Sequence, residues 1–203
     1  MMPTSDNASM RAPRKKVVCI GINYVSRKAY PQVHGQLSGC IKDAVKISSF
    51  LSEYWRSSFQ GTIEIKILRD DSSNADEIPT KNNIIKAMRW LIKDARPEDS
   101  LVFHYSGHSG QIRDRNGDEA DGYEEVILPI DGDCISTNDM HELMAKPLPL
   151  GCRLVALFDT SFAKTPALSQ DTYLTRKRIK YQSVQARAIS FSSFKDSRIS
   201  MDT

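Results

Sequence analysis

Four short apolar segments, rich in β-branched residues, constrain the fold more than any other feature of the chain. They are residues 17–22, 63–68, 101–105 and 154–158. Continuous apolar runs of this length are typical of strands that are buried on both faces of a parallel sheet. Parallel neighbours need crossover connections, which helices usually provide. The four runs therefore predict an α/β fold with a mostly parallel central sheet.

Helical patterns separate the predicted strands. Apolar residues recur at helical spacing over residues 40–54, between the first two strands. Thr80 is a suitable N-cap for a second helix over residues 80–92. A third, weaker pattern covers residues 138–145. This alternation predicts helices on both faces of the sheet, and hence three layers.

The distribution of charge argues against nucleic acid as a partner. The 203-residue chain has a net charge of +3, but residues 172–203 alone carry seven Lys or Arg against two Asp, so the remainder is net acidic. Nucleic-acid binding would need a basic stripe across the folded region. No segment approaches the roughly 18 apolar residues of a membrane span, and the polar N-terminus is not a secretory signal. We expect a cytoplasmic protein, with the nucleus as the alternative.

Polar residues with catalytic potential follow two of the predicted strands. His108 lies in a predicted loop with Gly107 and Gly110, where we expect an accessible imidazole. A solvated turn residue is the simpler interpretation of a lone histidine. Asp159 ends another apolar strand, and Ser161 is the only candidate nucleophile beside it. Because sites in such folds form beyond the carboxyl ends of the strands, His108 and Ser161 match a hydrolase dyad.

An acidic segment with eight Asp or Glu covers residues 114–133. Four residues match ligand positions of an EF-hand calcium loop: Asp114, Asn116, Asp118 and Glu125. Glu119 occupies the position where that loop needs glycine, and predicted strands rather than helices flank the segment. A solvated acidic loop is therefore the favoured interpretation.

Five segments, taken in order, carry the motifs of one protein family. They are VVCIGINY (17–24), GCIKD (39–43), ARPEDSLVFHYSGHSGQ (95–111), DEADGYEEVILP (118–129) and KPLPLGCRLVALFD (146–159). Together they resemble metacaspases of the fungal type, which are caspase-like cysteine endopeptidases. The resemblance implies a caspase-like three-layer sandwich, with a mostly parallel central sheet flanked by helices.

The resemblance also implies catalytic roles for two residues. The family's HYSGHGGQ histidine, its general base, corresponds to His108. The family's nucleophilic cysteine lies in a D-S-C-H-S-G segment, which here reads DTSFAK over residues 159–164, so that Ser161 holds the cysteine position. A hydroxyl is a poor nucleophile unless a base and an oxyanion hole are placed for it. Loss of a protease nucleophile costs roughly a million-fold in turnover, so we expect negligible peptidase activity.

A substrate site for Arg or Lys is implied at Cys40, Asp43, Ser106 and Asp159. Two carboxylates there would pair with a guanidinium group. The alternative interpretation is that Asp43 only caps or solvates its helix. The expected partners are therefore a basic peptide or protein substrate and, in a further hypothesis, another metacaspase.

Calcium commonly activates members of the family. The matching ligand positions are Glu124, Thr137 and Asn138, and a further acid falls near Leu168. Thr137 has no charge and Asn138 offers only a carbonyl oxygen. Glu124 and Asn138 are thus weak calcium candidates, and we expect no high-affinity site.

The sequence predicts four segments. Residues 1–16 are a disordered leader, 17–170 a caspase-like large-subunit domain and 171–187 a basic linker. Residues 188–203 resemble the start of the family's small subunit, inside which the chain is expected to stop, with 189–194 as an edge strand. Three functions remain open: an active Arg/Lys-specific endopeptidase, a non-catalytic peptide- or partner-binding domain, and a truncated product without activity.

Overall fold

The structure is a computed structural model that describes residues 12–25, 35–114, 117, 122–162 and 187–192. The strands are β1 (Arg14–Gly21), β2 (Thr62–Arg69), β3 (Ser100–Arg113), β4 (Tyr123–Ile127), β5 (Ile135–Ser136), β6 (Arg153–Phe162) and β7 (Arg187–Ser192). The helices are α1 (Cys40–Arg56), η1 (Ala75–Glu77), α2 (Lys81–Ile92), α3 (Thr137–Met140) and the π-helical turn η2 (His141–Ala145).

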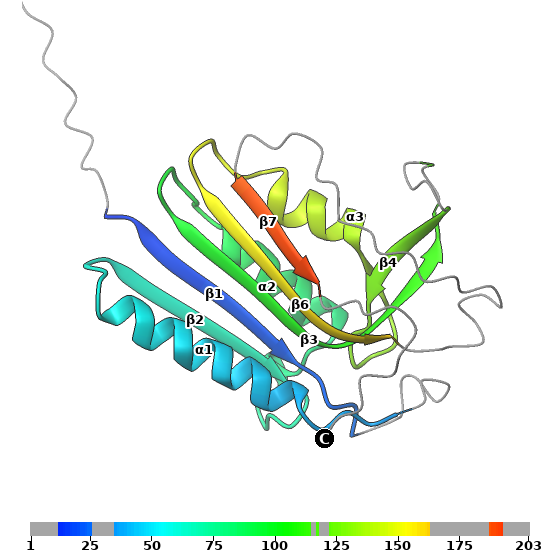
Figure 1. Cartoon of the computed structure of the whole chain (residues 1–203). Coiled ribbons are helices and arrows are strands. Elements are labelled where there is room, and N and C mark those ends of the chain that lie inside the picture. The colour runs from blue at the N-terminus through cyan, green and yellow to red at the C-terminus, as the bar shows by residue number, and fades with distance from the viewer. Residues whose placement is uncertain (1–11, 26–34, 115–116, 118–121, 163–186, 193–203) are drawn as a thin grey trace, which may run out of the picture.

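A single mixed sheet organises these elements (Figure 1). β2, β1, β3, β6 and β7 lie side by side in that order, and every pair among them is parallel. β4 pairs with the far end of β3, and β5 with β4, both antiparallel. The sheet is therefore mixed rather than purely parallel, and the expected α/β class with a mostly parallel centre is confirmed.

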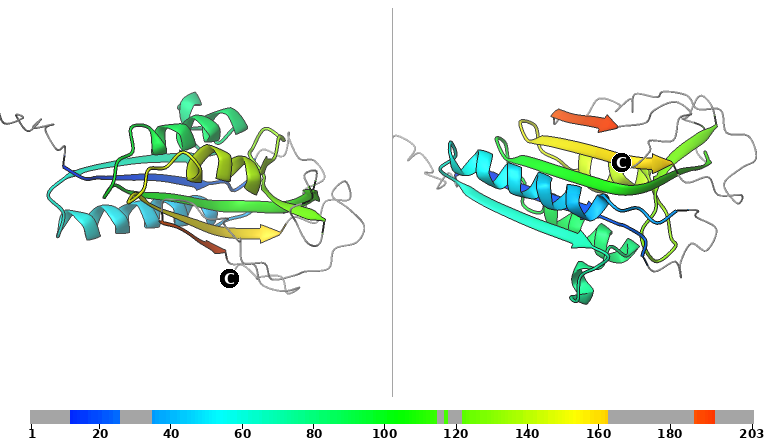
Figure 2. Two further views of the ribbon diagram at one scale, coloured as in Figure 1. Left: turned by 90° about the horizontal axis from the view of Figure 1, so that it is seen from above. Right: turned by 60° about the horizontal axis from the view of Figure 1, so that its bottom comes forward.

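Helices cover both faces of the sheet, which gives the three layers (Figure 2). α1 covers one face, where Val17, Cys19 and Val102 belong to one buried cluster. α2 and η2 cover the other face, where Phe103 and Tyr105 belong to a larger cluster. Since successive side chains of a strand point to opposite faces, the even-numbered residues of β3 and the odd-numbered residues of β6 lie on the α1 face.

Two strands extend further than the sequence analysis predicts. Residues 106–111 were expected to form a loop, and this expectation is wrong, because β3 continues to Arg113. β6 likewise continues to Phe162, so that Asp159 and Ser161 lie within it. β3 pairs in parallel with β6 as far as Ser109, and its antiparallel pairing with β4 begins at the same residue. Neighbouring strands thus satisfy the backbone of this glycine-containing segment, which a loop would leave to solvent.

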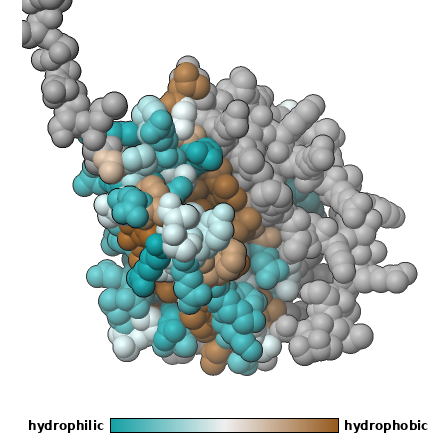
Figure 3. Space-filling view, turned by 60° about the vertical axis from the view of Figure 1, so that its left-hand side comes forward, coloured by the Kyte–Doolittle hydropathy of each residue, from teal (hydrophilic) through white to brown (hydrophobic). Residues whose placement is uncertain are grey.

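The described surface is mixed in character. Figure 3 shows hydrophobic residues interspersed with hydrophilic ones on the side that lies at the left in Figure 1. The large hydrophobic side chains that are exposed include Phe50 and Tyr54 on α1, whose rings stack with centroids 6.0 Å apart. No helix in the part of the chain that the structure describes is long and apolar enough to cross a membrane.

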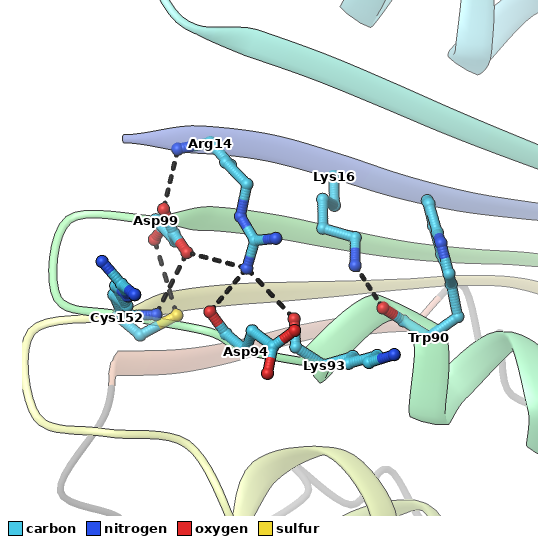
Figure 4. Close-up of polar contacts among 8 residues, drawn as sticks. Arg14, Lys16, Trp90, Lys93, Asp94, Asp99 and Cys152 are labelled. Atoms are coloured by element: carbon cyan, nitrogen blue, oxygen red, sulfur yellow. Dashed lines mark hydrogen bonds and ion pairs between the residues drawn. The ribbon is translucent and has the colours of Figure 1, made fainter. Parts of the chain in front are cut away.

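β1 begins at Arg14, so it includes the last three residues of the predicted leader; residues 1–11 lie outside the description. Its first residue is fixed by Asp99, a carboxylate with no exposed surface (Figure 4). Asp99 accepts hydrogen bonds from the backbone N–H groups of Arg14 (2.7 Å) and Arg96 (3.0 Å). It also lies 3.5 Å from the guanidinium of Arg14.

The guanidinium group of Arg14 also caps the carboxyl end of α2. Arg14 donates to the carbonyl oxygens of Lys93 (3.0 Å) and Asp94 (2.6 Å). These carbonyls follow the last turn of the helix, where no intrahelical donor is available. One ion pair therefore joins the start of β1, the end of α2 and the turn before β3.

Replacing Asp99 by alanine is expected to lower the free energy of unfolding by roughly 2–4 kcal/mol, because two backbone N–H groups and a guanidinium lose a buried acceptor. Urea denaturation followed by circular dichroism measures the change. Glu98→Ala is the matched control: the side chain is exposed, and its loss should cost less than about 0.5 kcal/mol. Equal stabilities of the two variants would contradict the anchoring role.

Candidate active site

The register between β3 and β6 brings the two predicted catalytic residues together. His108 and Ser161 are direct partners across the parallel pair. They lie 53 positions apart in the chain, so the sheet alone makes them neighbours. The expectation that His108 is accessible is wrong, because the residue is only 3% exposed. Its strand conformation and the ring of Tyr24, 4.6 Å away between centroids, account for this burial.

Two backbone carbonyl groups lie against the imidazole of His108. Nε2 is 2.9 Å from the carbonyl oxygen of Gly35, and Nδ1 is 3.3 Å from that of Ser161. Because a carbonyl oxygen only accepts, a neutral imidazole that donates from Nε2 to Gly35 keeps its Nδ1 lone pair on the side of residue 161. A general base needs this orientation toward a nucleophile at that position.

A pair of buried tyrosine hydroxyls fixes the backbone of His108. Tyr24 accepts from the N–H of His108 (3.0 Å) and donates to the carbonyl of Leu128 (2.5 Å). Tyr105 donates to the carbonyl of His108 (2.7 Å) and accepts from the N–H of Leu128 (3.2 Å). The two hydroxyls are 3.0 Å apart. Burial raises the pKa of both phenols, so they stay protonated and can donate at any physiological pH.

The backbone around this pair is constrained. Tyr24 has a positive φ of 56°, which is unfavourable for a bulky side chain and indicates that the surroundings impose it. Gly107 has no room for a side chain, because an added Cβ would lie 2.7 Å from the hydroxyl of Tyr105 and 3.1 Å from that of Tyr24. The glycine before His108 is therefore required by packing rather than by a turn.

The four predicted substrate residues lie on or beside the α1 face of the sheet. Ser106 and Asp159 are direct partners in β3 and β6, and Cys40 and Asp43 are in the first turn of α1. Asp159 is exposed and Asp43 is half-buried, whereas Cys40 and Ser106 are only 8% and 2% exposed. The two carboxylates are thus the members of this group that a dissolved cation can reach.

The two carboxylates act on one buried side chain. Burial lowers the pKa of His104, while the charges of Asp159 and Asp43 act in the opposite direction. Asp43 from α1 and Asp159 from β6 therefore share one electrostatic neighbour, the imidazole of His104. Their role in binding a basic side chain stays a prediction.

The weak calcium candidates Glu124 and Asn138 also lie together. The Oε1 atom of Glu124 accepts from the backbone N–H of Asn138 (2.8 Å), and Glu124 is only 6% exposed. This carboxylate therefore holds the start of α3. Among the described residues, no three His, Cys, Asp or Glu are grouped to hold a metal ion; residues 118–121 and Leu168 lie outside the description. Calcium binding at Glu124 and Asn138 stays a prediction.

Two of the buried cysteines, Cys19 and Cys152, are poorly suited to act as nucleophiles. All four cysteines are free thiols. Burial raises the pKa of Cys19 to about 12 and that of Cys152 to about 11. Cys152 precedes β6, whereas Ser161 lies near the other end of that strand. Neither thiol forms a useful fraction of thiolate at neutral pH.

The family model for the metacaspase peptidase C14 domain matches residues 15–168. The chain belongs to the metacaspase family. It is 45% identical to Metacaspase-1 of Scheffersomyces stipitis over 170 residues, which cover 82% of this chain and 40% of that protein. It is 48% identical to Metacaspase-1B of Neurospora crassa over 155 residues, which cover 75% of this chain and 34% of that protein.

This metacaspase chain spans two fifths or less of the length of these two curated relatives. A crystal structure of a protein from Geobacter sulfurreducens shares the fold, with a TM-score of 0.56 at 25% identity over 73% of this chain and 50% of that chain. The expected metacaspase resemblance and caspase-like fold are confirmed. The family is one of caspase-like cysteine peptidases. The catalytic roles of His108 and Ser161 stay predictions.

Three parts of the metacaspase site escaped the sequence analysis: Tyr24, Tyr105 and the carbonyl of Gly35. The tyrosines had a signal, because each follows or ends an apolar run, and a buried phenol needs a hydrogen-bond partner. The carbonyl of Gly35 had no such signal, because every residue carries a backbone carbonyl group.

Tyr24→Phe is expected to lower the free energy of unfolding by about 1–3 kcal/mol, because the N–H of His108 and the carbonyl of Leu128 lose a buried partner. Urea denaturation measures the loss. Tyr54→Phe removes a hydroxyl from a side chain that is 60% exposed and should change stability by less than about 0.5 kcal/mol. A Tyr24→Phe protein as stable as the parent would show that the hydroxyl network is dispensable.

Proposed function

We propose that this metacaspase domain binds Arg or Lys side chains of peptides but cleaves them poorly. The observation that carries the proposal is the register of β3 and β6, which puts Ser161 opposite His108. The metacaspase resemblance assigns that position to a cysteine. The domain would then keep the general base of the family and lack its nucleophile.

The chemistry of the two side chains supports impaired cleavage. A cysteine thiol ionises near pH 8.5, and a neighbouring imidazole readily makes it a thiolate. A serine hydroxyl is far less acidic and needs a base on its own oxygen together with a well-placed oxyanion hole. The contacts of the His108 ring are with the carbonyls of Gly35 and Ser161, not with the Ser161 hydroxyl.

The acidic pair, defined as Asp43 and Asp159, supports the specificity for basic side chains. Both carboxylates are accessible and both act on His104. A guanidinium or ammonium group between them would meet two negative charges at the carboxyl edge of the sheet.

Ser161→Cys is expected to raise cleavage of an Arg-terminated fluorogenic peptide by at least about 100-fold over the parent, since a thiol beside His108 gains nucleophilicity. A citrulline peptide of the same sequence, neutral at the cleavage position, should remain uncut. Each assay is run with and without calcium.

A second readout is the rate at which iodoacetamide alkylates the thiol introduced by Ser161→Cys. That rate should fall when His108→Gln is added, because the imidazole no longer favours the thiolate. A parent protein that cleaves as fast as the Ser161→Cys variant would contradict impaired catalysis. An alkylation rate that is the same with and without His108→Gln would contradict the proposal that His108 is retained as a base.

A second candidate function is pairing with another metacaspase through the sheet edge. Within the described residues, β7 pairs only with β6, so its other side is open. An open edge can add a strand from a second chain by backbone hydrogen bonds. Deleting residues 186–203 should abolish capture of a full-length metacaspase in a pull-down. If the capture survives the deletion, the edge at β7 is excluded as the pairing surface.

A further inference from the structure

A buried imidazole lies close to the acidic pair and has no part in the proposed catalysis. His104 belongs to β3, is 3% exposed, and its Nδ1 atom has no hydrogen-bond partner among the described residues. A buried polar atom without a partner costs free energy, so its presence calls for an explanation. By strand alternation His104 lies on the α1 face, as do Ser106 and Asp159.

The surroundings of His104 come from three elements besides its own strand. Its register partners are Cys19 of β1 and Leu157 of β6. The titratable groups on these elements include Cys19, Cys40, Asp43 and Asp159, and His108 lies further along β3. On α1, the exposed Lys46 lies 3.9 Å from the Oδ1 atom of Asp43. Burial keeps the thiol of Cys19 protonated. The charges that act on His104 are therefore those of the acidic pair.

We propose that His104 is a specificity-determining residue of the basic-side-chain site, in which a proton on its imidazole and a cationic ligand compete for Asp43 and Asp159. The proposal rests on the proposed function, because it takes the acidic pair as the binding site. Without a ligand, the two carboxylates are the only described source of charge stabilisation for an imidazolium at this buried position. With a guanidinium between them, their charge is neutralised and a like charge is added nearby.

The competition has a reciprocal consequence. Binding of a cation must release the proton from His104, and protonation of His104 must weaken binding by the same factor. Burial lowers the pKa of His104 from its usual 6.5, so the loss of affinity sets in below that pH. A neutral ligand does not compete with the proton of His104, so deprotonation of His104 does not raise the affinity for it. The residue thus favours a cationic ligand only while it is itself uncharged.

The test uses the full chain and Nα-acetyl-arginine amide, with its neutral citrulline analogue as the control ligand. Isothermal titration calorimetry gives Kd between pH 7.5 and 5.0. For the parent, affinity for the arginine ligand should fall on the order of fivefold to tenfold over this range. For His104→Gln, which cannot be protonated, the fall should be less than about twofold. His141→Gln, the same substitution in η2 on the opposite face of the sheet, should keep the fall seen in the parent.

NMR titration of the parent's histidine rings provides a readout that does not depend on any variant. Saturation with the arginine ligand should lower the pKa of His104 by up to about one unit, which corresponds to the tenfold change in Kd. The same pKa with and without ligand, or an equal fall in affinity for parent and His104→Gln, would overturn the proposal while leaving the acidic pair intact. No binding of the arginine ligand at pH 7.5 would overturn the acidic pair as a binding site, and this inference with it.

Discussion

The parallel register between β3 and β6 is the constraint on which the rest of the site depends. It sets Ser106 beside Asp159 and His108 beside Ser161, and both pairs lie at the carboxyl edge of the sheet. A slip by one residue would turn each of these side chains to the opposite face. The register holds because the strands are paired over ten positions and because hydrophobic residues below the site alternate between two separate clusters.

The hydroxyl groups of Tyr24 and Tyr105 fix the backbone at positions that the parallel strand pairing alone does not hold. Each hydroxyl accepts one N–H and donates to one carbonyl, and the partners are the same two residues, His108 and Leu128. Such a network is fully satisfied, which is the condition under which buried polar groups stabilise one conformation. The backbone position of His108 is therefore built into the core, and it does not depend on the side chain at position 161.

The sequence patterns predicted the parallel centre of the fold because continuous apolar runs have few alternatives to buried strands. They missed the extension of β3 because Gly107, Ser109 and Gly110 have no preference for a strand. That stretch becomes a strand through pairing with β6 and β4, which no local pattern encodes. His108 and Ser161 could be assigned from motif resemblance, whereas their burial, the Gly35 carbonyl and the tyrosine network depend on tertiary contacts.

Two buried polar side chains, Asp99 just before β3 and His104 within it, differ in how their charge is compensated. Asp99 has no exposed surface, but its oxygens accept hydrogen bonds from Arg14 and Arg96. Donors of the protein itself therefore compensate its charge. His104 is nearly as buried, yet its Nδ1 has no partner within the described residues, and Asp159, one of the charges that act on it, is exposed to solvent. A compensated charge resists change, whereas an uncompensated group responds to a charge that arrives beside it. Protonation of His104 is therefore the change that we propose to be coupled to ligand binding.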